Sequence, residues 1–193
     1  MGKWTQLVNR SIAASLLIGL GDYALLKMGN PIGPVIFALG LLGVCYMGLN
    51  LFTGKCGFLF EDRIPPAELG MILLVNLVSG YVIGLIFSLA DPAVAEAAVL
   101  KAQGWEMSLA FFIRSVLCGV VMYVAVLMYR KKTPLGILFG IPLFIFCGFQ
   151  HCIANVITMG AARTWHTSLI ICVAGNFLGS LIIWYLSREM KTK

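Results

Sequence analysis

The sequence predicts an all-α membrane protein, because its composition is strongly apolar and its apolar residues gather in segments of membrane-spanning length. Of its 193 residues, 60% are hydrophobic and 11% are charged, whereas soluble domains carry about 25% charged residues. A solvated globular enzyme, a disordered chain, a collagen-like fibre and a nucleic-acid-binding domain are therefore excluded. The basic residues behind the net charge of +6 stand at the ends of apolar segments, where they act as topology signals.

Six segments reach the length of about 20 mostly apolar residues that a spanning helix requires. They cover residues 8–27, 31–54, 67–90, 107–129, 134–160 and 166–187. We read the first as a spanning helix and not as a secretory signal, because Asp22 interrupts it and no small-residue cleavage site ends it. The connections are short, so we expect a single transmembrane domain over residues 1–193. The longest connection, residues 91–106, is expected to be a surface loop.

The basic residues are divided unequally between the two sides of such a protein. With six spans both termini share one side, and that side carries nine Lys and Arg residues: Lys3, Arg10, Arg63, Arg130, Lys131, Lys132, Arg188, Lys191 and Lys193. The other side carries Lys27, Lys101 and Arg163. The positive-inside bias therefore predicts a multi-pass protein of the cell (inner) membrane with both termini in the cytoplasm.

The two halves of the chain carry matching features in the same order. Polar and glycine residues interrupt the second segment at residues 48–55 and the fifth at residues 148–155. Because each half has three spans, the second copy must be inverted in the membrane. We therefore expect a 3+3 inverted repeat over about residues 1–90 and 107–193, with broken second and fifth helices, as in an aquaporin-like fold.

Glycine pairs at helical spacing are a further feature that the halves share. Gly80 and Gly84 lie in the third segment, and Gly175 and Gly179 lie in the sixth. Small residues four apart let two helices approach closely in a membrane. We interpret both pairs as packing positions rather than as pore positions.

The polar side chains at the two interruptions are candidate pore residues, since polar groups at bilayer depth are either buried in protein or line a cavity. They are Gln150, His151 and Asn155 in the fifth segment and Asn50 and Thr53 in the second. His151 can hand a proton to a weak-acid anion or hold it by a hydrogen bond, and the anion then avoids most of the desolvation cost of a buried charge. The alternative is a buried histidine that only packs between helices.

Two basic residues within the apolar segments are candidates for attracting anions. Lys55 follows the first interruption, and its alternative role is to extend its ammonium group toward the membrane interface. Arg114 lies near the start of the fourth segment, where an ion pair with Glu106 is the alternative.

The chain lacks the residue patterns of an enzyme or a metalloprotein. It has no Ser/His/Asp set, no paired carboxylates and no phosphate-binding glycine loop, so we expect no catalysis and no cofactor. Its six cysteines show neither a CxxC pair nor a metal-ligand spacing. We expect them to be small buried thiols rather than disulfides or metal ligands.

The interrupted segments resemble the signature segments of the formate/nitrite transporter family. Residues 37–41 followed by 50–53 resemble its second helix and the break in it, and residues 148–155 resemble the break in its fifth helix. Residues 112–118 and 175–179 are similar to its fourth and sixth helices. The resemblance implies a lipid-embedded homopentamer in which each six-helix protomer has its own pore for small monovalent anions such as formate, nitrite or hydrosulfide.

The resemblance also implies roles for individual residues. Polar positions of the pore match His151, Thr53 and Asn176, and the outer lysine of the family lies close to the place of Lys101. Apolar constrictions match Phe37 and Phe144 on the outer side and Leu41, Phe52 and Met122 on the inner side. Gln150 and Asn50 stand where the family commonly has acids, which lowers the negative charge along the path and should favour an anion.

Two functions of other classes remain open on the sequence. A neutral-solute or water channel uses a similar repeat, but no Asn-Pro-Ala triplet occurs at either interruption. In a non-conducting membrane scaffold, His151 and Asn50 would only pack. The residues do not choose among formate, nitrite and hydrosulfide, or between a passive channel and proton-coupled transport.

Overall fold

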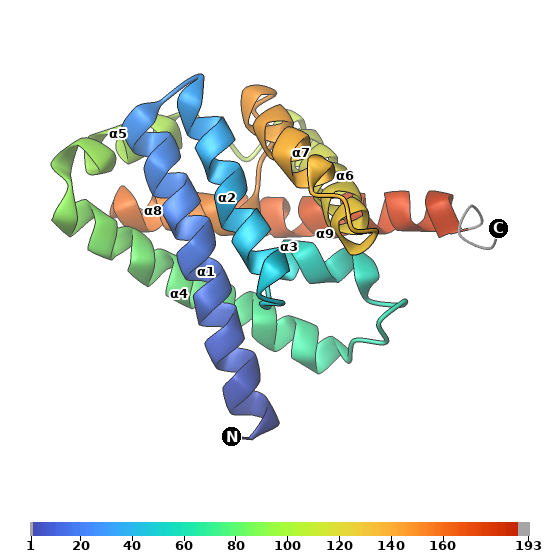
Figure 1. Ribbon diagram of the computed structural model, residues 1–193. Coiled ribbons are helices and arrows are strands. Elements are labelled where there is room, and N and C mark those ends of the chain that lie inside the picture. Colours follow the sequence, from blue (N-terminus) through green and yellow to red (C-terminus); the bar gives the residue numbers. More distant parts are fainter. Residues whose placement is uncertain (1, 189–193) are drawn as a thin grey trace.

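The computed structural model describes residues 2–188, and all the regular secondary structure in this range is helical. In chain order the elements are α1 (Lys3–Met28), α2 (Ile32–Tyr46), α3 (Phe52–Lys55), the 3-10 helix η1 (Cys56–Phe58), α4 (Pro66–Ala90), α5 (Pro92–Gln103), α6 (Leu109–Arg130), α7 (Leu135–Phe146), α8 (Cys152–Ala161) and α9 (Ser168–Ser187) (Figure 1). Two residues of the predicted charge asymmetry, Lys191 and Lys193, lie outside the described residues.

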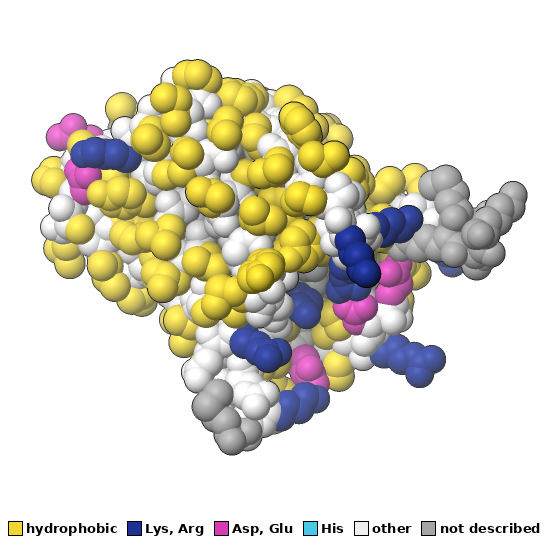
Figure 2. Space-filling view, in the orientation of Figure 1, with side chains coloured by type: hydrophobic (Ala, Val, Ile, Leu, Met, Phe, Trp, Pro, Cys, Tyr) yellow, Lys and Arg dark blue, Asp and Glu magenta, His cyan; other side chains and the backbone are white. Residues whose placement is uncertain are grey.

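Four helices of the described chain, α1, α4, α6 and α9, are long and apolar enough to cross a membrane. Figure 2 shows hydrophobic side chains over most of one face of the molecule, with charged side chains in two separate groups. Large apolar side chains such as Leu89, Leu100 and Phe139 are at least 70% exposed. An exterior of this kind is suited to lipid or to a neighbouring subunit rather than to water.

The second and fifth apolar segments are each divided into two helices. Helix α2 ends at Tyr46 and α3 begins at Phe52, while α7 ends at Phe146 and α8 begins at Cys152. Gly48 and Gly148 adopt φ values of +63° and +67° just after the first helix of each segment. A left-handed residue at this position reverses the chain at a helix end, and glycine adopts it without a steric penalty. Both divisions fall where the sequence predicts interruptions.

Two buried asparagines hold the short helices to the long ones. Asn76 of α4 accepts the Phe52 N–H through Oδ1 and donates through Nδ2 to the Asn50 carbonyl, at 2.9 and 3.1 Å. Asn176 of α9 likewise accepts the Cys152 N–H and donates to the Gln150 carbonyl, at 2.9 and 2.7 Å. Each amide therefore supplies partners to backbone groups that the interruption leaves without helical hydrogen bonds. Asn76 was not predicted from the sequence.

Each short helix packs on long helices of the other half of the chain. Helix α3 contacts α6 and α9, and η1 also contacts α9, whereas α8 contacts α1 and α4. Helices α2 and α7 contact each other between the two halves. This exchange brings the two interruptions together in the interior.

The predicted close approach at the glycine pairs is confirmed, but the two pairs face different partners. A Cβ on Gly84 would lie 2.0 Å from the Ile157 carbonyl oxygen of α8, and one on Gly179 would lie 1.9 Å from the Val116 carbonyl oxygen of α6. These contacts leave room for a hydrogen atom only. The glycine pairs are therefore packing positions. The residues that make equivalent hydrogen bonds in the two halves are Asn76 and Asn176.

The prediction of a surface loop over residues 91–106 was wrong, because most of this connection forms α5. Asp91 accepts the Ala93 N–H at 3.0 Å, and Pro92 occupies the first helical position, so the Asp-Pro pair starts a helix instead of a turn. Val94, Ala98 and Ala102, spaced four residues apart, are buried. This helix carries Lys101 to the site described below.

Candidate functional site

The centre of the site is a hydrogen bond between the two interrupted segments. Thr53 Oγ1 of α3 lies 2.8 Å from His151 Nε2, and the side chains of both residues are buried. His151 also precedes α8, where its Nδ1 accepts the Ala154 N–H at 3.1 Å. A ring nitrogen that accepts carries no proton, so neutral His151 carries its proton on Nε2 and donates it to Thr53. The Thr53 hydroxyl then keeps its own hydrogen to donate.

A cavity of about 250 Å³ reaches His151 from the end of the molecule where α1 finishes. We call it the Lys101 cavity after the basic residue in its wall. Phe37 and Phe144 also line it, with ring centroids 6.0 Å apart and planes at 89°, and the Phe144 ring stacks on His151 at 5.9 Å. The two phenylalanines predicted to form the outer constriction therefore lie beside the buried histidine.

The charge of Lys101 is balanced within its cavity. Its ammonium lies 2.9 Å from Asp22 Oδ1 and 3.1 Å from the Thr158 hydroxyl, and that hydroxyl donates to Asp22 Oδ2 at 2.7 Å. Asp22 is fully buried, and a buried carboxylate requires such partners. Asp22 was not predicted as a site residue. The signal that could have found it is an acid within an apolar segment.

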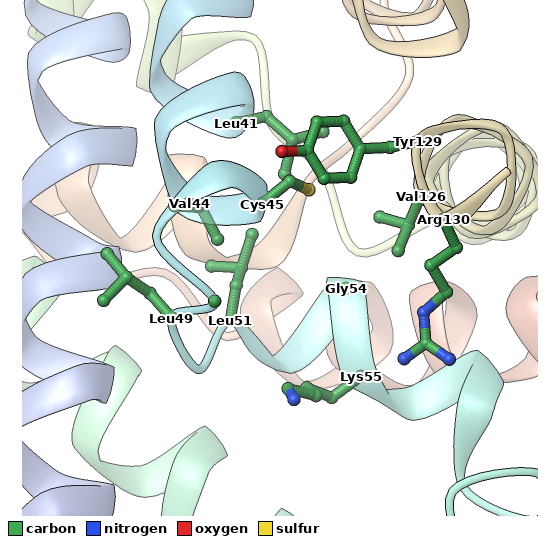
Figure 3. Close-up of a pocket in the computed structure, with 11 residues that line it drawn as sticks. Leu41, Val44, Cys45, Leu49, Leu51, Gly54, Lys55, Val126, Tyr129 and Arg130 are labelled. Atoms are coloured by element: carbon green, nitrogen blue, oxygen red, sulfur yellow. The ribbon is translucent and has the colours of Figure 1, made fainter. Parts of the chain in front are cut away.

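A second cavity, of about 300 Å³, opens at the end of the molecule where α1 begins. We call it the Lys55 cavity. Figure 3 shows Lys55 and Arg130 on one side of it and Leu41, Cys45 and Tyr129 on the other. Leu41, predicted as part of the inner constriction, follows Phe37 by one turn of α2, so this helix passes both cavities. The Thr53–His151 pair lies between them.

The remaining predicted residues are distributed unevenly around this path. Gln150 and Asn155 line the Lys101 cavity, where Asn155 Nδ2 donates to Gln150 Oε1 at 3.0 Å. The predicted residues that line neither cavity are Thr53, which lies between the two, and Asn50, Phe52, Met122, Asn176 and Arg114. Of these, Phe52 stacks on Phe177 with centroids 6.5 Å apart.

The alternative ion pair of Arg114 does not form. Arg114 is exposed on α6, and the ion pairs within residues 2–188 are Lys3–Glu68, Lys27–Asp91, Lys101–Asp22 and Arg130–Asp62. Arg114 takes part in the fold through its carbonyl, which accepts the Gln150 N–H at 3.4 Å.

Most of the cysteines have the predicted environment. The buried thiols are Cys56, Cys118, Cys152 and Cys172. The prediction was wrong for Cys147, which is exposed, and for Cys45, which is half-buried beside Lys55. No group of His, Cys, Asp and Glu in the described part of the chain is arranged to hold a metal ion.

Known proteins resemble this chain in both sequence and fold. The family model described as formate/nitrite transporter matches residues 2–186. The uncharacterized transporter YrhG of Bacillus subtilis (strain 168) is 29% identical over 200 residues, which cover 86% of this chain and 75% of YrhG. The nitrite transporter NirC of Salmonella typhimurium (strain LT2) is 24% identical over 211 residues, which cover 95% of this chain and 76% of NirC.

Two solved structures share the fold. An FNT family ion channel superposes with a TM-score of 0.81 at 21% identity, covering 99% of this chain and 92% of its own. A pentameric formate channel with formate bound superposes with a TM-score of 0.67 at 18% identity, covering 98% of this chain and 95% of its own. The matching family consists of channels and transporters, so the protein is a multi-pass membrane transporter and not an enzyme. With a family match over nearly its full length, the chain belongs to the formate/nitrite transporter family.

Proposed function

We propose that the protein is a channel or transporter for small monovalent anions of the formate, nitrite or hydrosulfide type, or for their conjugate weak acids. The observation that carries this proposal is the buried Thr53–His151 hydrogen bond of 2.8 Å between two cavities. The family membership supports the class of substrate, since NirC is named a nitrite transporter and one protein of the same fold holds formate.

The central pair offers a hydrogen bond to the passing solute. Thr53 accepts from His151 Nε2–H, which orients the hydroxyl hydrogen away from the imidazole and leaves it for a carboxylate or nitrite oxygen. A hydrogen bond of this kind replaces part of the hydration that the anion loses between the apolar rings of Phe37 and Phe144.

Of the two roles considered for His151, the geometry favours the hydrogen bond over proton donation. Donating a proton requires the imidazolium, in which Nδ1 also carries hydrogen. That hydrogen would face the Ala154 N–H, which now donates to Nδ1 at 3.1 Å. A neutral His151 that gave up its one N–H proton would become an imidazolate anion, which does not form near neutral pH. The proton that neutralises the solute therefore comes from water, and flux of a weak acid should rise as pH falls.

The proposal includes the membrane arrangement of the protomer. Helices α2 with α3, and α7 with α8, form broken spans that join the four long helices, giving six spans in one transmembrane domain. The equivalent hydrogen bonds of Asn76 and Asn176 support an inverted repeat over about residues 1–90 and 107–193. The grouping of Lys27 with Asp91 and of Lys101 with Asp22 at the end opposite Lys3 supports termini in the cytoplasm.

The proposed assembly is a homopentamer in the cell membrane with one pathway in each protomer. The apolar exterior of the single chain supports contact with lipid and with other copies (Figure 2). The pentameric formate channel of the same fold supports this number of subunits.

The test is flux of formate, nitrite and hydrosulfide into proteoliposomes between pH 5 and pH 8, for the wild type and for His151→Asn. We expect selective flux that rises as pH falls, and a much lower flux at every pH in the variant, because the hydrogen bond that orients the Thr53 hydroxyl is lost. Flux of water or glycerol with none of these anions would instead identify a neutral-solute channel. No flux from folded pentamers would favour the scaffold.

A further inference from the structure

The two ends of the proposed pathway differ in how their basic residues are compensated. Lys101 forms an ion pair with Asp22 at 2.9 Å. At the other end, Lys55 lines its cavity and takes part in none of the ion pairs formed within residues 2–188. One mouth is therefore close to neutral, and the other carries an uncompensated lysine.

The neighbours of Lys55 do not cancel its charge. Arg130 donates two hydrogen bonds to Asp62, at 2.9 and 2.5 Å, and its guanidinium lies 3.7 Å from the centroid of the Phe58 ring. That carboxylate is therefore engaged by Arg130. Lys55 and Arg130 both line the cavity, and no carboxylate of the described residues belongs to its wall. The charged side chains that face this space are therefore basic.

The cavity around Lys55 has the size and the walls to use this charge. Its volume of about 300 Å³ exceeds the roughly 30 Å³ that one water molecule occupies in the liquid, so a three-atom anion fits with several waters. Leu41, Val44 and Leu51 form part of its wall (Figure 3). Apolar walls around a single sign of charge focus the field and concentrate counter-ions.

We propose that the Lys55 cavity is an anion-binding subsite for small monovalent carboxylates and oxoanions, and that it loads the pathway from the end of the molecule where α1 begins. This inference rests on the proposed function and adds to it a difference in anion affinity between the two mouths. The Lys101 cavity binds anions less well, because Asp22 offsets its lysine. Anion capture is therefore faster at the Lys55 mouth than at the Lys101 mouth.

The experiment compares the two mouths in proteoliposomes of uniform orientation, at equal pH on both sides and zero membrane potential. The quantity is the ratio of the apparent KM for formate entering at the Lys55 mouth to that for formate entering at the Lys101 mouth. In the wild type this ratio is expected to be about 0.1, since a focused field raises the local anion concentration by about tenfold or more. The two maximal rates should differ in the same ratio, because a passive pathway conducts equally in both directions at low formate concentration. Lys55→Gln should bring the KM ratio close to one, and Lys55→Arg should keep it low.

A matched control and a binding measurement separate this inference from the proposed function. Lys131→Gln removes an exposed charge just after α6 and should leave the ratio unchanged. Calorimetric titration of detergent-purified protein with formate should show about tenfold weaker binding for Lys55→Gln. A wild-type ratio near one, or binding unchanged in Lys55→Gln, would overturn the subsite. Absence of flux in every variant, with weakened binding in Lys55→Gln, would overturn transport and leave the subsite standing.

Discussion

Asn76 and Asn176 make equivalent hydrogen bonds, each to a backbone N–H that lies 24 residues earlier in the chain. Each side-chain oxygen accepts at 2.9 Å from the first residue of a short helix, Phe52 or Cys152. Each amide nitrogen also donates to a carbonyl just before that helix. The same pair of asparagine hydrogen bonds therefore fixes the backbone at each interruption. Thr53 and His151 come within hydrogen-bonding distance because both interruptions are fixed in this way.

Removing one of these asparagines should destabilise the fold. Asn76→Ala leaves the buried Phe52 N–H and two carbonyls without their partner, and each unsatisfied group costs about 1–3 kcal/mol. We expect a Tm lower by several degrees in detergent. Asn9→Ala, at an exposed position on α1, should leave the Tm unchanged. Equal melting of the two variants would show that the Asn76 hydrogen bonds contribute nothing to stability.

The hydroxyl of Thr53 should be required for flux. Thr53→Val keeps the shape but leaves His151 Nε2–H unpaired, at a cost of about 1–3 kcal/mol, and removes the donor proposed for the solute. Formate flux should fall by about tenfold or more, since 1.4 kcal/mol corresponds to a factor of ten. Thr53→Ser, which keeps a hydroxyl, should retain most of it. Comparable flux in the valine and serine variants would contradict the proposed donor.

Releasing Lys101 from its acid should strengthen anion capture at its mouth. Asp22→Asn keeps hydrogen-bonding atoms beside Lys101 and Thr158 but removes the negative charge. The apparent KM for formate entering there should fall by about threefold or more, because the positive charge of Lys101 is no longer neutralised by Asp22 and can attract the anion. The double variant Asp22→Asn/Lys101→Gln should reverse the gain. An unchanged KM in Asp22→Asn would mean that Asp22 does not offset Lys101.

The contact of α4 with α8 should tolerate no side chain at Gly84. An alanine Cβ would lie 2.0 Å from the Ile157 carbonyl oxygen, so the helices would have to separate at a cost of about 1–3 kcal/mol. Gly70→Ala, on the same helix with nothing within 4 Å, should gain up to about 1 kcal/mol from helix propensity. Thermal melting should show a lower Tm for Gly84→Ala and an equal or higher Tm for Gly70→Ala. A higher Tm for Gly84→Ala would refute the close contact of α4 with α8.

Acid should weaken the loop between η1 and α4. Arg130, which donates two hydrogen bonds to Asp62, holds the pKa of that carboxyl below its ordinary value of 3.8. A lowered pKa contributes stability above the unfolded-state value, and this is lost as pH falls through the folded-state value. The Tm of the wild type should therefore drop more steeply below about pH 4 than that of Asp62→Asn. Glu96→Gln, at an exposed position on α5, should keep the wild-type slope.

The sequence by itself determined the features that depend on neighbours along the chain. Apolar length located the four long helices. Glycine and polar residues located both interruptions, because a left-handed turn at Gly48 and Gly148 is a local requirement. The local pattern was misleading at residues 91–106, because an Asp-Pro pair is compatible both with a turn and with the start of a helix. The helix α5 forms here with Val94 buried against the rest of the protein.

Only the tertiary structure decided which distant side chains meet. Thr53 and His151 lie 98 residues apart in the sequence, and Asp22 and Lys101 lie 79 apart. Their pairing depends on the packing of α3 and α8 against helices of the opposite half, which no local periodicity encodes. The same packing gives Lys101 a carboxylate and leaves Lys55 without one. The physical reason is that a pattern along the chain fixes the type of an element, whereas charge balance depends on which elements become neighbours.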